Sequence, residues 1–166
     1  MNEPTFYDAA VRDVQCGSGV TIVRPANLYE CTLGDDCFVG PFTEIQRGVV
    51  IGRGSRVQSH VFICELVTIG EDCFISHGAK FVNDLWRTGQ IERHDQSAWG
   101  RTEVGDGVLI GTNATILPVR IAAGVVVGAG AVVTHDLSEP GIYAGCPARR
   151  IGDVPPRSEL YSGETR

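Results

Sequence analysis

The sequence has little lysine, little methionine and few aromatic side chains. Its 166 residues include one lysine, Lys80, and one methionine, and only 7% are aromatic. Hydrophobic residues nevertheless make up 43%. A buried core must therefore be assembled from small and branched aliphatic side chains, which favours β-structure.

Long apolar runs, a secretory leader and paired cysteines are also missing. The longest apolar stretch, around 121–133, is broken by glycines and is too short to cross a bilayer. The polar start MNEPTFYD is unlike a signal peptide. The six cysteines form no C-x-x-C pair, and free thiols are the norm inside cells. We therefore expect a cytoplasmic protein that does not enter a membrane.

The sequence also lacks the positive charge of a nucleic-acid-binding protein. Its formal net charge is −6, which argues against a nucleic-acid partner. Almost all of its positive charges are arginines, whose planar guanidinium suits phosphate and carboxylate groups. An anionic small-molecule substrate is therefore compatible with the composition.

Glycine is abundant, with 21 residues, and the chain carries a repeat of six residues. An apolar residue recurs at every sixth position, is often followed by glycine, and has a small or β-branched residue four positions later. These rung positions are Cys16, Ile22, Leu28, Leu33, Val39, Ile45, Ile51, Val57, Ile63, Ile69, Ile75, Phe81 and, after an interruption, Val104, Ile110, Ile116, Ile121, Val127 and Val133. The steps from 28 to 33 and from 116 to 121 are one residue short, and we interpret them as tightened corners.

A six-residue period suits a short strand followed by a turn. Three such units close one triangular coil of 18 residues, with the rungs inside, and stacked coils bury each other's faces. The sequence therefore predicts an all-β, parallel β-helix in the form of a triangular prism of about six coils, as one domain over residues 1–166. The polar segment at about 84–103, with two tryptophans, is expected to form an excursion loop, and residues from about 134 to 166 a cap and tail.

The 18-residue coil also predicts which distant side chains lie side by side. Arg47, Glu65 and Asn83 are spaced by 18 residues and each comes two positions after a rung, so they should form one outward column. Ser59 and His77 should form a second column by the same spacing. A column of cation, carboxylate and amide suits an amine ligand, and it is also compatible with a polar ladder that only solvates the prism.

The repeat resembles that of the hexapeptide-repeat acyltransferases over about residues 16–152. The stretch 27–84, with its strings FICE and FVND, is similar to members that N-acetylate nucleotide-linked amino sugars. The ending CPARRIG is similar to the terminal acetyl-CoA-binding coils, with Cys146 where asparagine is usual. The resemblance implies a left-handed β-helix, a homotrimer, acetyl-CoA bound between neighbouring prisms, no metal, and a role in making glycan or lipopolysaccharide precursors.

On this resemblance, the first column would hold the acceptor amine. The functional asparagine of the FxND string falls on Asn83, which would orient the nitrogen or stabilise the oxyanion. Glu65 would bind the ammonium group or accept its proton. His60, which could reach Asn83 across a trimer groove, and His77 are alternative bases, and the departing thiolate of CoA is a third. Further substrate contacts are expected from Arg47, Asp84 and Trp86.

Acetyl-CoA is expected toward the later coils. The backbone amides of Gly111 and Ala129 would meet its pantetheine arm, because small residues let a ligand approach the backbone. Arg149 and Arg150 would meet its phosphates through charge-assisted hydrogen bonds. The alternative is that these two arginines only cap the last coil.

Three other functions are compatible with the predicted fold. A sugar O-acetyltransferase needs a stronger base than an N-acetyltransferase, because an alcohol is harder to deprotonate. A γ-type zinc carbonic anhydrase needs three converging imidazoles, and no third histidine is in register with His60 and His77. A non-catalytic assembly module would have no use for the tryptophan-bearing loop or the CoA-like ending.

Overall fold

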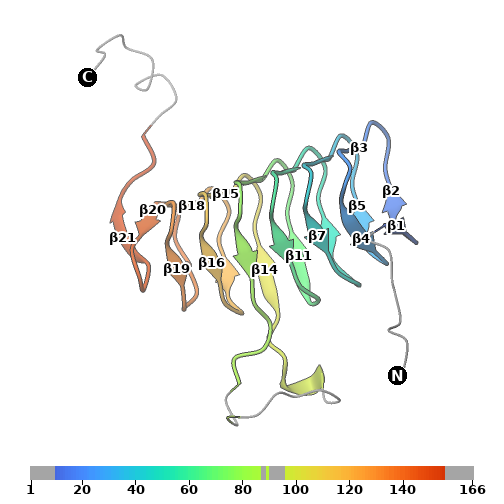
Figure 1. Ribbon diagram of the computed structural model, residues 1–166. Helices are drawn as coiled ribbons and strands as arrows, with labels where there is room; N and C mark the ends of the chain where they lie inside the picture. The colour runs from blue at the N-terminus through green and yellow to red at the C-terminus, as the bar shows by residue number, and fades with distance from the viewer. Residues whose placement is uncertain (1–9, 87–88, 90–95, 156–166) are drawn as a thin grey trace.

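Short β-strands follow one another through the chain in the computed structural model, which describes residues 10–86, 89 and 96–155. Within these residues there are 21 strands and one 3-10 helix, η1 (Gln96–Ala98). Successive strands enter three sheets in turn, here called sheets A, B and C. The coils therefore stack along one axis, from the first strand at one end to the last at the other (Figure 1).

Each sheet collects one strand from each coil. Sheet A contains β1 (Val11–Arg12), β4 (Asn27–Tyr29), β7 (Glu44–Ile45), β10 (Phe62–Ile63), β13 (Lys80–Phe81), β16 (Thr115–Ile116) and β19 (Val132–Val133). Sheet B contains β2 (Gln15–Cys16), β5 (Thr32–Leu33), β8 (Val50–Ile51), β11 (Val67–Ile69), β14 (Thr102–Val104) and β17 (Arg120–Ile121). Sheet C contains β3 (Thr21–Ile22), β6 (Phe38–Val39), β9 (Arg56–Val57), β12 (Phe74–Ile75), β15 (Leu109–Ile110), β18 (Val126–Val127), β20 (Ile142–Ala144) and β21 (Arg149–Gly152).

The strand register confirms the predicted β-helix. Ile45 pairs with Ile63, and Phe81 with Ile116, in parallel ladders. Among the described strands, only β20 and β21 pair antiparallel. The architecture is the left-handed parallel β-helix that the resemblance implied. Sheet A has seven strands, so there are about seven coils where six were predicted. The additional coil comes from β1, which lies upstream of the first predicted rung.

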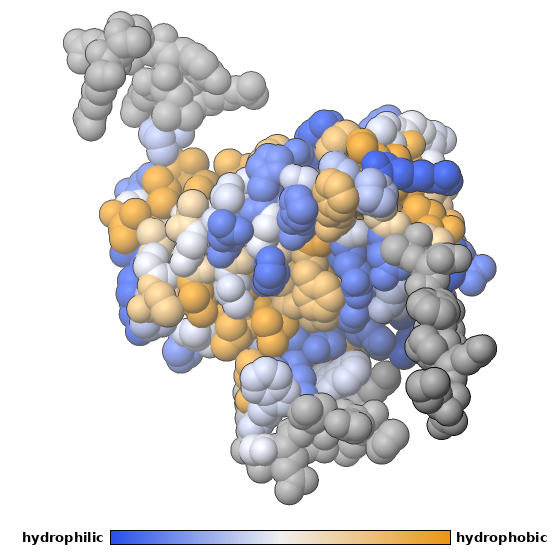
Figure 2. All heavy atoms as spheres, in the orientation of Figure 1, coloured by the Kyte–Doolittle hydropathy of each residue, from blue (hydrophilic) through white to orange (hydrophobic). Residues whose placement is uncertain are grey.

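The rung residues form the core. From Leu28 to Val133, every rung is at most 5% exposed. The small residues four positions later are also buried, and the two polar ones bond to backbone carbonyls: Thr43 Oγ1 to Gln58 O at 2.9 Å and Ser55 Oγ to Gly70 O at 2.8 Å. The outer face in Figure 2 mixes hydrophilic and hydrophobic residues, so the continuous aliphatic ladder lies inside the prism.

The first coil departs from the predicted ladder. Cys16 is exposed and Ile22 is only half-buried. A rung is buried by the coils on both of its sides, and the described chain provides no complete coil before β2. These two residues therefore lie at the open end of the prism.

Glycine after a rung is required where coils approach closely. A Cβ on Gly52 would lie 2.5 Å from the carbonyl carbon and 2.6 Å from the carbonyl oxygen of Gly70 on the next coil. Backbone atoms cannot move away as a flexible side chain could. The corner between sheets B and C is therefore narrow because glycines stack on it.

The chain leaves the prism after β13 and returns at β14, and the described segments of the loop between them project from the side of the stack (Figure 1). The two strands that flank it belong to sheets A and B, so the loop emerges from the corner between these sheets. The Gly100 N–H donates to Asn83 O at 2.8 Å and closes its base. Part of the predicted loop lies outside the described residues.

The C-terminal part of the chain closes the last coil. Leu137 forms an isolated bridge with Ile121, and Tyr143 pairs with Val127 in the rung position. β21 then folds back on β20. The cap thus extends the sheets as far as Gly152, and residues 156–166 lie outside the described part. None of the described helices could cross a membrane.

Candidate active site

The predicted column of Arg47, Glu65 and Asn83 forms at the corner between sheets A and B, here called the A–B corner. Arg47 Nη2 lies 3.1 Å from Glu65 Oε1 and 3.3 Å from Oε2. Asn83 Nδ2 donates to the backbone oxygen of Glu65 at 3.3 Å. Each residue follows a sheet A strand by the same number of positions, and the parallel register brings them together.

The column differs from an ordinary surface ion pair in its burial. The Glu65 side chain is 17% exposed, while that of Arg47 is 51% exposed. The carboxylate is therefore held against the prism and the guanidinium lies over it. Asn83 Oδ1 has no hydrogen-bond partner among the described residues, so it is available to accept an N–H from a ligand.

Sequence reasoning missed three residues beside this column. Tyr29 lies near Glu44 and Glu65, and its pKa is raised by burial and then by these two carboxylates. Gln46 Nε2 donates to Glu44 Oε1 at 2.9 Å. The outer face of sheet A next to the column is therefore lined by hydrogen-bonding side chains. These three residues lie directly before or after a rung of sheet A. A polar or large side chain at such a position, in place of glycine, is the signal by which the sequence could have identified them.

The base of the excursion loop adjoins Asn83. Asp84 Oδ1 accepts the backbone N–H of Trp86 at 2.8 Å, and the Trp86 side chain is 62% exposed. Trp99 is half-buried, and its indole N–H has no hydrogen-bond partner within the described segments. Asp84 and Trp86 thus lie beside the predicted column, and their contact with substrate stays a prediction.

The two predicted histidines lie at the corner between sheets C and A, here called the C–A corner. Ser59 Oγ is 2.8 Å from His77 Nδ1, as the spacing of 18 predicted. His60 stacks on Phe42 with ring centroids 4.9 Å apart and 16° between the planes. Because β10 separates His60 from Glu65, both histidines lie at the opposite edge of sheet A from Asn83 within one chain. The structure does not bring them together with the first column.

The predicted cofactor residues Gly111 and Ala129 lie on adjacent coils of the C–A corner. The Gly111 N–H already donates to Val127 O at 2.7 Å, so this group belongs to the ladder. The Ala129 N–H has no partner among the described residues. Of the two predicted backbone donors, only the one at Ala129 is therefore free for a ligand.

The two predicted phosphate-binding arginines lie on β21. Arg149 is exposed, and its Nη1 donates to Ala148 O at 2.9 Å. Arg150 forms an ion pair with Asp153, and its pKa is raised by this hydrogen bond and charge. Arg149 is thus the freer of the two guanidinium groups.

The cysteines next to the column are unsuited to nucleophilic chemistry. Cys64 is buried beside Glu65, and burial raises the pKa of its thiol to about 12. Burial likewise raises the pKa of Cys31 to about 11. A thiol reacts as its thiolate, so both act as small apolar side chains.

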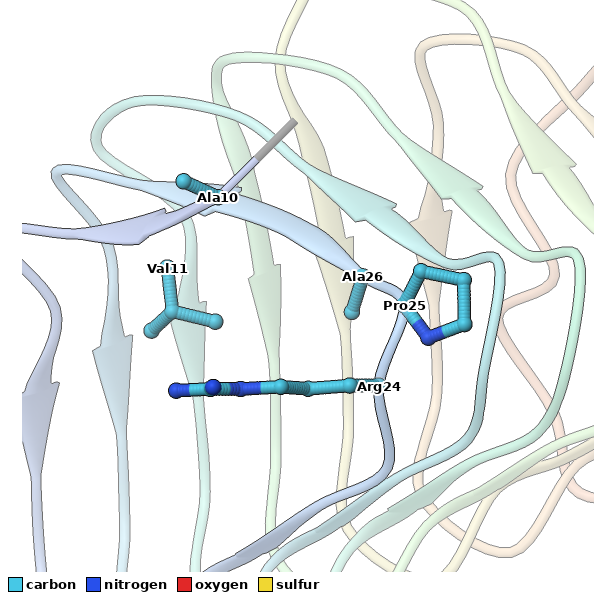
Figure 3. A pocket seen from close by; sticks show the side chains of 5 residues that line it. All are labelled: Ala10, Val11, Arg24, Pro25 and Ala26. Atoms are coloured by element: carbon cyan, nitrogen blue, oxygen red, sulfur yellow. The ribbon is translucent and has the colours of Figure 1, made fainter. Parts of the chain in front are cut away.

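One hollow lies away from the predicted column. A cavity of about 530 Å³ is lined by Ala10, Val11, Arg24, Pro25 and Ala26. Figure 3 shows the Arg24 side chain extended beside Val11 at this end of the prism. A second cavity, of about 240 Å³, shares Pro25 and Ala26 and reaches Phe42 and Glu44. Within the described ranges, no three His, Cys, Asp or Glu side chains are grouped so that they could hold a metal ion.

Two family models match this chain. The model of the bacterial transferase hexapeptide, with six repeats, matches residues 30–65, and that of the hexapeptide repeat of succinyl-transferase matches residues 101–135. Both matched segments lie within the coils of the β-helix. We therefore assign these two segments to the hexapeptide repeats found in transferases.

Curated relatives agree with this assignment. The bifunctional protein GlmU of Alkalilimnicola ehrlichii is 30% identical over 165 residues, which cover 90% of this chain and 35% of that protein. GlmU of Thermotoga maritima is 32% identical over 133 residues, which cover 75% of this chain and 29% of that protein. The chain thus spans about a third of the length of these relatives.

Solved structures share the fold. A hexapeptide transferase family protein from Anaplasma phagocytophilum superposes with a TM-score of 0.70 at 17% identity, over 89% of this chain and 83% of that one. A mutant perosamine N-acetyltransferase from Caulobacter crescentus, solved with CoA and GDP-perosamine, gives 0.63 at 21% identity, over 87% and 58%. The polySia-specific acetyltransferase NeuO gives 0.60 at 22% identity, over 86% of each chain.

Proposed function

We propose that the protein is an acetyl-CoA-dependent N-acetyltransferase that acts on the amino group of a nucleotide-linked amino sugar. The observation that carries this proposal is the column of Arg47, Glu65 and Asn83, whose half-buried carboxylate and free amide oxygen face outward at the base of the loop. Such groups bind an ammonium ion and orient the amine formed from it. The similarity to sugar acetyltransferase structures supports the same reading.

The column can perform the steps that acyl transfer to an amine requires. Glu65 first holds the ammonium group by charge, and its carboxylate takes one proton, which frees the nitrogen lone pair. The departing thiolate takes the second proton after the nitrogen has attacked. Asn83 Oδ1 accepts an N–H from the amine, so that the nitrogen lone pair points toward the acetyl carbonyl carbon. The C–N bond forms as the C–S bond breaks. Arg47 holds the Glu65 carboxylate in place through both of its oxygens.

Acetyl-CoA would supply the acetyl group as an activated thioester. The residue that fits it is Ala129, with its free backbone N–H. The missing side chain of Gly111 instead makes room for the next coil, since a Cβ there would lie 2.5 Å from Ala129 N. Arg149 is exposed and suits a phosphate. These groups lie at the C–A corner and on sheet C, whereas Asn83 lies at the A–B corner.

This separation fits the proposed homotrimer, in which the A–B corner of one chain faces the C–A corner of its neighbour. His60 or His77 of that neighbour would then approach Asn83. The exposed apolar pair of Phe74 and Leu109 on sheet C, 36% and 44% exposed, supports a contact surface between copies. The proposed setting is the cytoplasm and the synthesis of glycan precursors.

O-acetylation of a sugar hydroxyl is the second candidate, and the pair of Ser59 and His77 favours it. With Nδ1 bonded to Ser59 at 2.8 Å, Nε2 of His77 is left to act as a base, which an alcohol acceptor needs more than an amine. A change of His77 to alanine would then abolish the transfer.

The test follows thiol release from acetyl-CoA with a panel of nucleotide-linked amino sugars and with matched sugars that carry a hydroxyl in place of the amine. We expect release with an amino sugar only, and a product that is heavier by one acetyl group. Release with the hydroxyl sugars, abolished by His77→Ala, would favour the second candidate. Absence of release with either panel, together with no CoA binding by calorimetry, would contradict both.

A further inference from the structure

Two aromatic rings occupy strained positions at the C–A corner. Phe42 and His60 have φ values of 59° and 61°, in the left-handed region. Later coils place Gly78, Asn113 and Gly130 at this corner, which are residues that tolerate the conformation. A bulky residue with positive φ is an outlier that points to a function when the rest of the structure maintains it.

The core gains little from these rings. Phe42 is 58% exposed and His60 is also exposed. Their mutual stacking at 4.9 Å holds the Phe42 ring in a fixed orientation while it faces solvent. An exposed, rigid aromatic face is what a planar ligand requires for stacking.

Hydrogen-bonding groups lie next to this face. The cavity of about 240 Å³ extends from Phe42 to Asn27 and Glu44 on sheet A. One oxygen of Glu44 bonds to Gln46, and its other oxygen and Asn27 Nδ2 have no partner within the described residues. A base that stacks on Phe42 would therefore meet an acceptor and a donor at its edge.

A cation lies two coils further along the same edge of sheet A. Lys80 Nζ donates to Gly78 O at 3.0 Å, which draws the ammonium group to the C–A corner. No carboxylate of the described chain forms an ion pair with it. This unpaired charge stands out in a chain with a net charge of −6. From Lys80, three residues of extended chain lead to Asn83, a span of about 10 Å.

We propose that Phe42 and Lys80 form the binding site for a nucleoside diphosphate, with the base stacked on Phe42 and the diphosphate against Lys80. The inference rests on the proposed function, since the diphosphate would then lead along sheet A to an amino sugar at Glu65 and Asn83. Adenine and phosphates are also present in CoA. We favour the nucleotide of the acceptor sugar over CoA as the ligand of this site. Phe42 lies about three coils, or about 14 Å, from Gly111, which is where CoA is expected.

The test measures binding of UDP, GDP, uridine and CoA to the full chain by calorimetry, without any acetyl donor. We expect Phe42→Ala to weaken UDP or GDP binding roughly tenfold or more, the scale of one base–aromatic stack, and Phe42→Trp to retain it. Lys80→Ala should weaken UDP binding and leave uridine binding unchanged. Val50→Ala is the matched control, since Val50 is 42% exposed on sheet B.

The melting temperature distinguishes a role of Phe42 in nucleotide binding from a role in the stability of the fold. Phe42→Gly removes the ring and relieves the left-handed strain, so the melting temperature should stay level or rise while nucleotide binding is lost. A lower melting temperature with binding retained would overturn the proposal, and so would a loss of CoA binding with UDP binding unchanged. If UDP binds at Phe42 but no amino sugar is acetylated, the proposed function fails and this site stands.

Discussion

At the scale of single residues, the proposed chemistry lies in positions that follow a rung. Arg47, Glu65 and Asn83 each occupy such a position, and the rungs themselves are buried aliphatic side chains. An outward residue can therefore change without disturbing the core. This separation lets point mutations distinguish a role in the reaction from a role in the fold.

The first residue-scale prediction concerns the ion pair of the column. Glu65→Gln should lower kcat/KM for the amino-sugar acceptor at least roughly tenfold, because the ammonium ion loses its counter-charge. The free energy of unfolding should change by less than about 1 kcal/mol, since Arg47 is half-exposed. Steady-state kinetics and urea unfolding measure the two quantities.

The chain offers a matched control for this change. Arg53 and Glu71 form an ion pair at 2.7 Å with the same spacing of 18 residues, at the corner between sheets B and C. Glu71→Gln should have a similarly small effect on stability and none on activity. If both variants reduce activity equally, Glu65 has no specific role.

At the scale of elements, the excursion loop depends on a contact between its end and a later coil. Gly100 bonds to Asn83 O, and a Cβ on Gly100 would lie 2.6 Å from Cγ of Pro118. The proline ring therefore lies against the Gly100 backbone. This contact fixes the point at which the chain re-enters the prism, beside Asn83.

Gly100→Ala should therefore displace the base of the loop. We expect a loss of stability of about 1–3 kcal/mol, typical of overpacking, and a fall in kcat because Asn83 shifts. The double variant Gly100→Ala, Pro118→Gly should recover much of both, because the ring that clashes is gone. Unchanged unfolding and kinetics in the single variant would show that the contact does not position the loop.

The elements also show how far sequence reasoning reached. The six-residue period predicted the sheets and the column because backbone register alone determines both. The period did not predict that Tyr29 lies beside the column. Leu28 pairs with Ile45, which is 17 residues away, one residue fewer than the 18 of a regular coil. It also missed Leu137 and Tyr143, which close the last coil at irregular spacing. The contact between Gly100 and Pro118 was not predicted, because Gly100 lies in the segment expected to leave the prism, where the 18-residue spacing does not apply.

Other features depend on the place of a residue in the stack and on the geometry of the corners, and the six-residue period did not predict them. The exposure of Cys16 follows from its place at the open end of the prism. The bond from the Gly111 N–H to Val127 O follows from the ladder, and it leaves Ala129 as the free donor. The strained stack of Phe42 and His60 is a property of corner geometry that residue types alone do not reveal.

At the scale of the whole molecule, the prism gives each edge of sheet A a separate part of the proposed reaction. The A–B corner carries the column for the amine, and the C–A corner carries the stacked rings, the histidines and the residues that fit acetyl-CoA. Stacked coils bring residues from distant parts of the chain into one row. The account therefore depends on the column being the place where the acceptor reacts.

The most direct test replaces Asn83 with alanine and measures turnover and CoA affinity on the same preparation. The account predicts that kcat for the amino sugar falls about 100-fold or more, the scale of removing one group that acts on the reacting atoms. The dissociation constant for CoA should be unchanged, because Asn83 is proposed to contact the acceptor amine and neither the pantetheine arm nor the phosphates of CoA. Unchanged turnover in the Asn83→Ala variant would contradict the account.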